Sequence, residues 1–440
     1  NKLGNSDSTE QENEVQAATP SGNWYDYASS SSSAVYLSGT TFYINTAAGL
    51  AYAARWASNT ANPAAYASYT YKLNNDIDLS AHYWNYPFGL NDSRRFKGTF
   101  DGQGHRIYGI CIKEGNWQGG GDDFGFFRYT QGAKIKNVKF DYKVGKSYNS
   151  INGNTWGGVV ARTRGGSSTK TTISDVWVSG YMFQNTGIDR VGGFVGEAES
   201  WLEFNRCYST IFLDTEGGNT SNDHYIGGFV GYSNESSDVR FNYCVFRGVV
   251  WHDYGGGNAY AYGGGFIGRN NHNGSWPARF TGCVSAGLVT GNANWRQGGF
   301  VGYCKSNSSS DYPIYSGCVS LSISRPFGST STSVGYNFSS HGNYNNSTNW
   351  EAQFHSTSAR GTRVNTGNYK GSYSLSNLSS SWYYTLEYAY DKVPYSTKTS
   401  STNNASSYFT TTTSRDVPWP KGFGQVFNFS FSNYGNYFSP

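Results

Sequence analysis

The sequence predicts an all-β fold, a parallel β-helix in which the chain winds as a solenoid of stacked coils. Two observations carry this prediction. The 440 residues include 37 Tyr, 27 Phe and 56 Gly but one Met, a composition that favours strands and tight turns over helices. A glycine motif also recurs through the middle of the chain with a period typical of one solenoid coil.

The repeat is defined by the sequence Val-Gly-Gly-Phe-Val-Gly at residues 191–196. Close copies begin at Ile226, Gly263 and Gln297, and weaker ones at Asp123, Trp156 and Ser333. A short apolar element keeps the same spacing, as in Phe204-Asn-Arg-Cys207. Length varies in the loops between these elements, so each repeat over residues 96–340 is predicted to be one coil. A sandwich would instead need two-residue hairpin turns, which are mostly missing.

Equivalent residues of successive coils stack about 4.8 Å apart in a parallel β-helix. The motif therefore predicts a buried ladder of Phe194, Phe229, Phe266 and Phe300. A second predicted core ladder contains Cys207, Cys244, Cys283 and Cys318, at a position that earlier repeats fill with Val. A disulfide between stacked cysteines is an alternative, although parallel side-chain directions suit that bond poorly. No cluster of ligands at metal-binding spacing occurs, and no metal or other cofactor is expected.

The two ends of the chain differ from the repeats. Residues 42–95 are predicted to form an N-terminal cap with a short helix at residues 48–56 and the strands that lead into the coils. Residues 341–440 are predicted to be a C-terminal cap or small β region, because an open solenoid end presents unpaired strand edges. Residues 1–41 are predicted to form an extended N-terminal arm that docks on an adjacent copy and is needed for assembly. Its apolar residues are Trp24, Tyr25, Tyr27, Val35, Tyr36 and Leu37.

Candidate catalytic residues are few. The stretch from Asp101 to His105 is interpreted as a turn that the histidine closes with a hydrogen bond. The acid pairs Asp76/Asp78 and Asp122/Asp123 do not recur in register, so no catalytic residue is assigned. A set of tryptophans in or beside the variable loops is the better candidate for a functional site, as a glycan or subunit interface. The alternative is that these side chains only cover the edge of the coil. They are Trp117, Trp156, Trp201, Trp251, Trp276 and Trp295.

The segment Phe96-Lys-Gly-Thr-Phe-Asp-Gly-Gln-Gly-His-Arg-Ile107 precedes the repeated glycine motifs. Together with the helix and strands of residues 42–95, these motifs resemble the GLUG-motif family of bacterial secreted and surface proteins. The resemblance covers roughly residues 42–340. It implies a β-helix with repeated glycine turns, and it leaves the activity open because the family hosts different functions.

The predicted function is that of an extracellular structural or adhesive surface protein, a self-assembling subunit of a filament, sheath or layer. The predicted partners are copies of the chain itself. The predicted location is the extracellular space or the cell surface, after a signal peptide has been removed. A glycan-binding adhesin is the alternative, and a polysaccharide lyase or hydrolase is the third reading. The charge of +4, from 33 Lys and Arg against 29 Asp and Glu, argues against nucleic-acid binding. No apolar run is long enough to insert into a membrane.

Overall fold

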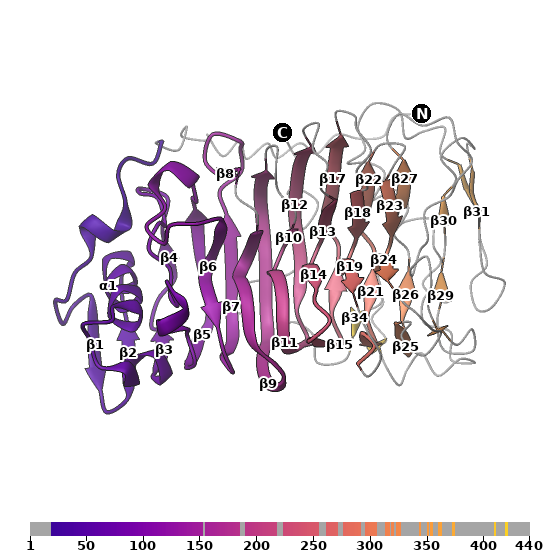
Figure 1. Cartoon of the computed structure of the whole chain (residues 1–440). Coiled ribbons are helices and arrows are strands. Elements are labelled where there is room, and N and C mark those ends of the chain that lie inside the picture. Colours follow the sequence, from indigo (N-terminus) through magenta and orange to yellow (C-terminus); the bar gives the residue numbers. More distant parts are fainter. Residues whose placement is uncertain are drawn as a thin grey trace, which may run out of the picture.

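The computed structural model describes residues 19–152, 155–184, 190–217, 223–254, 261–271, 276–291, 295–305, 313–316, 318–320 and 323–326. Between residues 327 and 440 it describes short strands alone, and residues 1–18 lie outside the described part. Strands β1 to β29 form one long stack with the helix α1 at its N-terminal end (Figure 1).

The N-terminal elements are η1 (Trp24–Tyr27), β1 (Val35–Ser38), β2 (Thr41–Ile44), α1 (Ala47–Ser58), η2 (Ala64–Ser68), β3 (Thr70–Leu73), β4 (Ile77–Asp78) and η3 (Asp92–Arg94). Helix α1 confirms the helix expected at residues 48–56. It begins after Thr46, whose Oγ1 accepts a hydrogen bond from the Gly49 amide at 3.1 Å and so satisfies one of the free N–H groups. Alanines and Leu50 form its buried face.

The first coils contain β5 (Thr99–Ile110), η4 (Glu114–Asn116), β6 (Asp123–Thr130), β7 (Lys134–Tyr142), β8 (Ser150–Ile151), β9 (Thr155–Gln184), β10 (Arg190–Gly192), β11 (Val195–Asn205), β12 (Tyr208–Gly217), β13 (His224–Gly227), β14 (Val230–Ser233), β15 (Asp238–Asn242), β16 (Val245–Phe246) and β17 (Val249–Tyr254). Later coils contain β18 (Ala261–Gly264), β19 (Ile267–Asn271), β20 (Arg279–Thr281), β21 (Val284–Ser285), β22 (Leu288–Gly291), β23 (Trp295–Gly298), β24 (Val301–Lys305), β25 (Ile314–Ser316), β26 (Val319–Ser320) and β27 (Ile323–Pro326).

The last described strands are β28 (Asn343–Tyr344), β29 (Trp350–Glu351), β30 (Gln353–Phe354), β31 (Arg360–Thr362), β32 (Ser372–Ser374), β33 (Phe409–Thr410) and β34 (Trp419–Pro420). Strands β28 and β29 pair in parallel with β25 and β26 and so continue the stack. The other five form small antiparallel sheets. Most of the predicted C-terminal cap, residues 341–440, lies outside the described residues.

Parallel pairing between successive repeats makes the solenoid. Val191 pairs with Trp156 of the preceding coil and with Ile226 of the next one. The same register continues from Ile226 to Gly263 and from Gly263 to Gln297. Copies of the glycine motif therefore lie directly above one another, and this arrangement confirms the predicted all-β parallel β-helix.

The parallel stack begins earlier than the sequence indicated. Strand β1 forms an antiparallel hairpin with β2, and β2 then pairs in parallel with β3. Strand β3 pairs in parallel with β5, which contains the first predicted repeat strand. The boundary expected at residue 96 thus falls inside one continuous sheet, and the described residues 19–41 belong to the cap instead of a separate arm.

Two aromatic ladders fill the core. Phe194, Phe229, Phe266 and Phe300 stack with ring centroids 4.6, 4.7 and 4.7 Å apart, at the position from which stacking was predicted. A second ladder is formed by the first residues of the recurring apolar element, Phe204, Phe241, Phe280 and Tyr315, with spacings of 4.7, 5.0 and 5.0 Å. Rings of the two ladders meet edge to face, as between Phe229 and Phe241 at 82°. This geometry suits the aromatic quadrupole.

A one-residue corner precedes Val138, Val176 and the core cysteines Cys207, Cys244 and Cys283. Asn137, Asp175, Arg206 and Tyr243 adopt φ of 55°, 54°, 52° and 56°, the left-handed conformation, which bends the chain at one residue. The four ladder cysteines are buried thiols that form no disulfide, and they take the place that Val138 and Val176 have in earlier coils. The Cys207 thiol donates to the Ile173 carbonyl at 3.2 Å, and the Cys318 thiol donates to the Phe280 carbonyl at 3.4 Å.

Candidate functional site

The glycine motif forms a re-entrant corner on the outside of the solenoid. In one coil, β10 ends at Gly192 and β11 begins at Val195. A Cβ atom on Gly192 would lie 1.8 Å from the Val195 carbonyl oxygen, and one on Gly193 would lie 2.1 Å from the Gly228 carbonyl oxygen. Only glycine fits at these positions. The bend turns outward-facing side chains of β10 and β11 towards each other.

Two rows of side chains meet across this corner, and we call them the corner ladder. The residues in register with Arg190, just before the motif, form the first row, which consists of Asp123, Thr155, Arg190, Tyr225 and Tyr262. The pairing of Phe124 with Trp156 shifts the first copy of the motif by one residue from its expected start at Asp123. The residues just after each motif form the second row, which consists of Tyr129, Arg162, Glu197, Tyr232, Arg269 and Tyr303. The positions that flank the motif thus place chemically active side chains in every coil.

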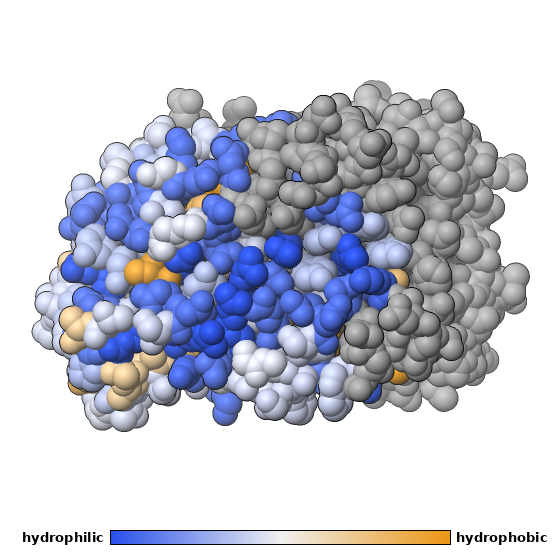
Figure 2. All heavy atoms as spheres, in the orientation of Figure 1, coloured by the Kyte–Doolittle hydropathy of each residue, from blue (hydrophilic) through white to orange (hydrophobic). Residues whose placement is uncertain are grey.

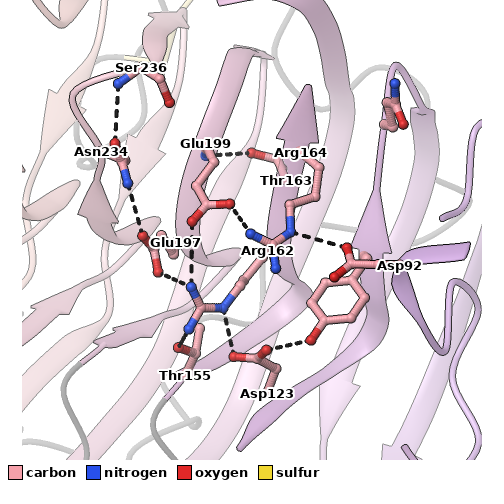
Figure 3. A network of polar contacts seen from close by, with 12 residues as sticks. Asp92, Asp123, Thr155, Arg162, Thr163, Arg164, Glu197, Glu199, Asn234 and Ser236 are labelled. Carbon is pink, nitrogen blue, oxygen red and sulfur yellow. Dashed lines mark hydrogen bonds and ion pairs between the residues drawn. The ribbon is translucent and has the colours of Figure 1, made fainter. Parts of the chain in front are cut away.

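The N-terminal half of the corner ladder is an ion-pair network (Figure 3). Arg162 Nε lies 2.7 Å from Asp123 Oδ1, and Arg162 Nη1 lies 2.5 Å from Glu197 Oε2. Arg190 Nε approaches the same Glu197 oxygen at 3.2 Å. The network continues outward through the Arg164–Glu199 pair, and Arg164 Nε lies 3.5 Å from Asp92.

Burial and pairing act in opposite directions on the carboxyl groups of this network. Burial alone would raise the pKa of Asp123, but the Arg162 charge and hydrogen bonds from Tyr129 and Arg162 outweigh it and lower that pKa. For Glu197, burial raises the pKa despite the opposing charges of Arg162 and Arg190. The Tyr129 hydroxyl donates to Asp123 Oδ2 at 2.5 Å, and burial together with that bond raises the pKa of Tyr129 to about 12.

The C-terminal half of the corner ladder is aromatic. Tyr225 stacks on Tyr232 across the bend at 5.0 Å and on Tyr262 of the next coil at 5.6 Å. The Arg269 guanidinium lies over the rings of Tyr225 and Tyr262, and its Nη1 donates to the Tyr225 hydroxyl at 2.7 Å. Tyr262 stacks in turn on Tyr303 at 4.9 Å.

The contacts of the corner ladder indicate a brace along the solenoid. Each buried carboxylate already accepts from an arginine, and Arg269 is held by tyrosine rings and by Asp223 at 3.5 Å. Acid–base catalysis needs a titratable group aimed at a substrate, and these groups are aimed at one another. Sequence analysis missed this set, although a charged or aromatic residue on both sides of most motif copies was the available signal.

The predicted tryptophan interface does not form one exposed row. Trp156 is fully buried, so its assignment to a surface is wrong. Trp117 is half-buried and packs on Phe124, and Trp201 is half-buried between Lys170 and Arg240. Trp251 is half-buried, while Trp276 is exposed at 40%. The side chain of Trp295 lies outside the described residues. The indole positions depended on loop conformations, which the repeat does not encode.

The segment from Asp101 to His105 lies within β5, at a break in the register between β5 and β7, and the histidine does not close a turn there. Asp101 Oδ1 accepts from the Gln103 amide at 2.9 Å, and Gln103 has a φ of 53°. His105 Nδ1 instead lies 3.1 Å from Asp76 Oδ1, a residue of the preceding coil. Asp78 caps the Ser80 amide at 2.9 Å. These acids therefore have local structural contacts.

The described part of the predicted arm packs on its own chain. Trp24 is buried, and its indole N–H donates to the Leu79 carbonyl at 2.9 Å. Val35 is buried in the same core, and Tyr25 stacks on Tyr86 at 5.1 Å. The prediction that this segment docks on another copy is therefore wrong for Trp24 and Val35, which are buried in their own chain. Tyr27, Tyr36 and Leu37 are exposed at the N-terminal end of the solenoid.

Two further features of the described residues concern ligands and membranes. No group of three or more His, Cys, Asp or Glu side chains lies together there in a way that could hold a metal ion. Among the same residues, no helix is both long enough and apolar enough to cross a bilayer.

The fold and the corner ladder define a parallel β-solenoid protein with a repeated glycine corner. No protein-family model matches the chain, and no curated protein matches it. Among solved structures, the chain is similar to one from Bacteroides ovatus that is described as a putative immunoglobulin A1 protease. The similarity has 16% sequence identity and a TM-score of 0.49, and it covers 71% of this chain and 84% of that chain. A likeness at this level does not extend to function, and the GLUG resemblance stays a prediction.

Proposed function

We propose that the chain is an extracellular structural protein that associates with copies of itself through the N-terminal end of its solenoid. The observation that carries the proposal is strand β1. It is the terminal strand of the sheet, and among the described strands it pairs with β2 alone. Its other edge therefore has backbone N–H and C=O groups that another strand can pair.

The side chains at this end also favour association. Tyr36 and Leu37 in β1 are 42% and 43% exposed, and Tyr36 stacks on Tyr43 at 5.0 Å. Figure 2 shows pale orange residues gathered over the end that β1, β2 and β3 form. Residues 34–45 contain no charged residue and no proline, the features with which proteins usually block an edge strand. Although β1 has only four residues, no described strand pairs with its outer edge.

The remainder of the solenoid suits a structural role. The aromatic ladders and the corner ladder run from coil to coil and tie each repeat to its neighbours. Repeats held by such nearest-neighbour contacts form stiff, elongated scaffolds. The proposal assigns no catalytic step, and secretion enters it through the family resemblance and the composition.

The proposal is tested by a charge substitution on the β1 edge. The double variant Tyr36→Lys/Leu37→Lys places one cation on each face of the strand, next to its outer edge, where the two charges repel an approaching second copy. We expect the wild-type chain to form dimers or filaments in analytical ultracentrifugation and negative-stain electron microscopy, and we expect the double variant to be monomeric with an unchanged circular dichroism spectrum.

A matched control is Val144→Lys, at a residue that is 52% exposed and lies between β7 and β8, away from β1. This variant should associate like the wild type. Two-fold pairing of β1 with β1 of a second copy gives a closed dimer, whereas pairing with the opposite end gives a filament. A wild-type chain that stays monomeric at high concentration, or equal loss of association in both variants, would overturn the proposal.

A further inference from the structure

A row of apolar side chains points away from the solenoid core. It lies on the strands that follow the one-residue corner at the core cysteines. We call it the lateral stripe, and it consists of Trp177, Tyr208, Val245 and Val284. These residues belong to β9, β12, β16 and β21 and are in direct register from coil to coil. The register continues to Val319 in β26 and to Trp350 in β29.

The outward direction of the stripe follows from strand alternation. Successive side chains of a strand point to opposite faces. Val176 and Val178, on either side of Trp177, belong to the main hydrophobic core, and so do Cys244 and Phe246 on either side of Val245. Trp177, Tyr208, Val245 and Val284 are not part of that core cluster. They therefore form a separate apolar row on the outer surface of the sheet.

This outer row is nevertheless fully buried. Among the described residues, the Trp177 ring contacts Lys139 at 3.6 Å and Tyr208 at 5.5 Å, and its N–H donates to Thr210 at 2.8 Å. All three partners lie on the same outer face, so they cannot cover the row from above. Other residues of the same chain must therefore do so.

The cover has a sharp limit towards the N-terminal end. Lys139 is next to Trp177 in the same row and is only 3% exposed. Arg106, one coil earlier in that row, has a side chain that is 43% exposed. The covering layer thus begins at about Lys139 and extends along the apolar rungs at least to Val284.

The composition of the two ends of the chain favours residues 375–440 over residues 1–18 as the covering segment. Residues 1–18 offer Leu3 and Val15 as their large apolar side chains. Residues 375–440 are rich in aromatic residues and include Trp382-Tyr-Tyr384 and Phe427-Asn-Phe-Ser-Phe431. Part of this segment forms a hairpin in which Phe409 pairs with Pro420 and Thr410 with Trp419.

The topology also delivers this segment to the stripe. Strand β29 is the last rung in register with the row, so the chain leaves the solenoid at the C-terminal end of the stripe. The rungs from Trp350 back to Trp177 span on the order of 24 Å at the spacing of parallel strands. An extended stretch of about eight residues is long enough to cover that distance.

We propose that the lateral stripe is the docking face for residues 375–440 of the same chain, which run back along the side of the solenoid as a strap. The strap covers an outer apolar surface that the coils alone leave exposed. It is distinct from the β1 edge, so it does not depend on end-to-end association. A chain that lost the strap would present a second, lateral adhesive surface.

The direct test is site-specific photo-crosslinking in the full-length chain. A diazirine analogue of methionine replaces Val245, and crosslinked peptides are identified by mass spectrometry. We expect the main product to join Val245's position to a peptide from residues 375–440. Mixed light and heavy isotope-labelled chains show whether the link lies within one molecule. The matched control carries the probe at Ser174, an outward residue on the preceding face. It should give no such product.

A second measurement keeps the proposal falsifiable if the probe disturbs folding. A protease site inserted after residue 374 is cleaved in the folded, full-length protein. We expect the fragment to remain bound during gel filtration, and its release in mild urea to raise the fluorescence of a dye that binds apolar surfaces. Crosslinks to residues 1–18, crosslinks between light and heavy chains, or a fragment that leaves at once without a change in dye binding would each overturn the strap.

Discussion

Replacing Phe229 with Ala is expected to weaken the solenoid strongly at its centre. The ring is fully buried and lies between Phe194 at 4.6 Å and Phe266 at 4.7 Å. It also meets Phe204 and Phe241 edge to face at 5.5 and 5.4 Å. Its backbone N–H donates to the Phe266 carbonyl at 3.1 Å, and its carbonyl accepts from the Phe194 N–H at 3.0 Å.

These backbone hydrogen bonds fix the spacing of the coils, so the gap left by the ring cannot close. Buried Phe→Ala substitutions cost about 3–5 kcal/mol, and aromatic pairs contribute about 0.5–1.5 kcal/mol beyond their buried area. With four ring partners, we expect a loss near the upper end, about 4–5 kcal/mol in the free energy of unfolding.

The assay is equilibrium unfolding in urea followed by far-ultraviolet circular dichroism. Because solenoids can unfold in parts, amide hydrogen exchange at Phe194 and Phe266 should be measured in parallel. Phe229→Leu serves as the control and should cost less, since it keeps more of the side-chain volume. A loss below about 1 kcal/mol for Phe229→Ala, with unchanged exchange, would refute the ladder as the main source of stability.

Three further predictions concern single residues. Gly193→Ala should prevent normal folding, because its Cβ would lie 2.1 Å from the Gly228 carbonyl oxygen, and a wild-type melting curve would contradict this. Cys244→Val should cost less than about 1.5 kcal/mol in urea unfolding, since the thiol fills a small apolar site. Burial lowers the pKa of Lys139 to about 8, against the opposing charge of Asp141. Above that pH the unfolded chain binds more protons, so stability should rise between pH 8 and about 10 in the wild type. Lys139→Met should lack that rise, as urea midpoints at the two pH values would show.

The sequence by itself determined the repeat, its period and therefore the stacking. Equivalent residues of a repeat can all be buried only if the coils lie in register, so the recurring Phe and Cys positions indicated the core. Glycine pairs at one point of each coil indicated the sharp bend. These inferences depend on local identity between repeats, and local identity is visible in a sequence.

Other features depended on which surfaces the bend and the covering segments bring together. Equivalent positions of the corner ladder hold different residue types, such as Arg, Glu and Tyr, so no repeated residue marks them in the sequence. Trp156 and Trp276 were both assigned to the same candidate interface, yet one is buried and the other exposed. Trp177 and Val245 alternate with core residues like any outward side chains, and only the tertiary structure shows that they are covered. Burial is a property of what packs on a surface from elsewhere in the chain, and a repeat pattern contains no record of it.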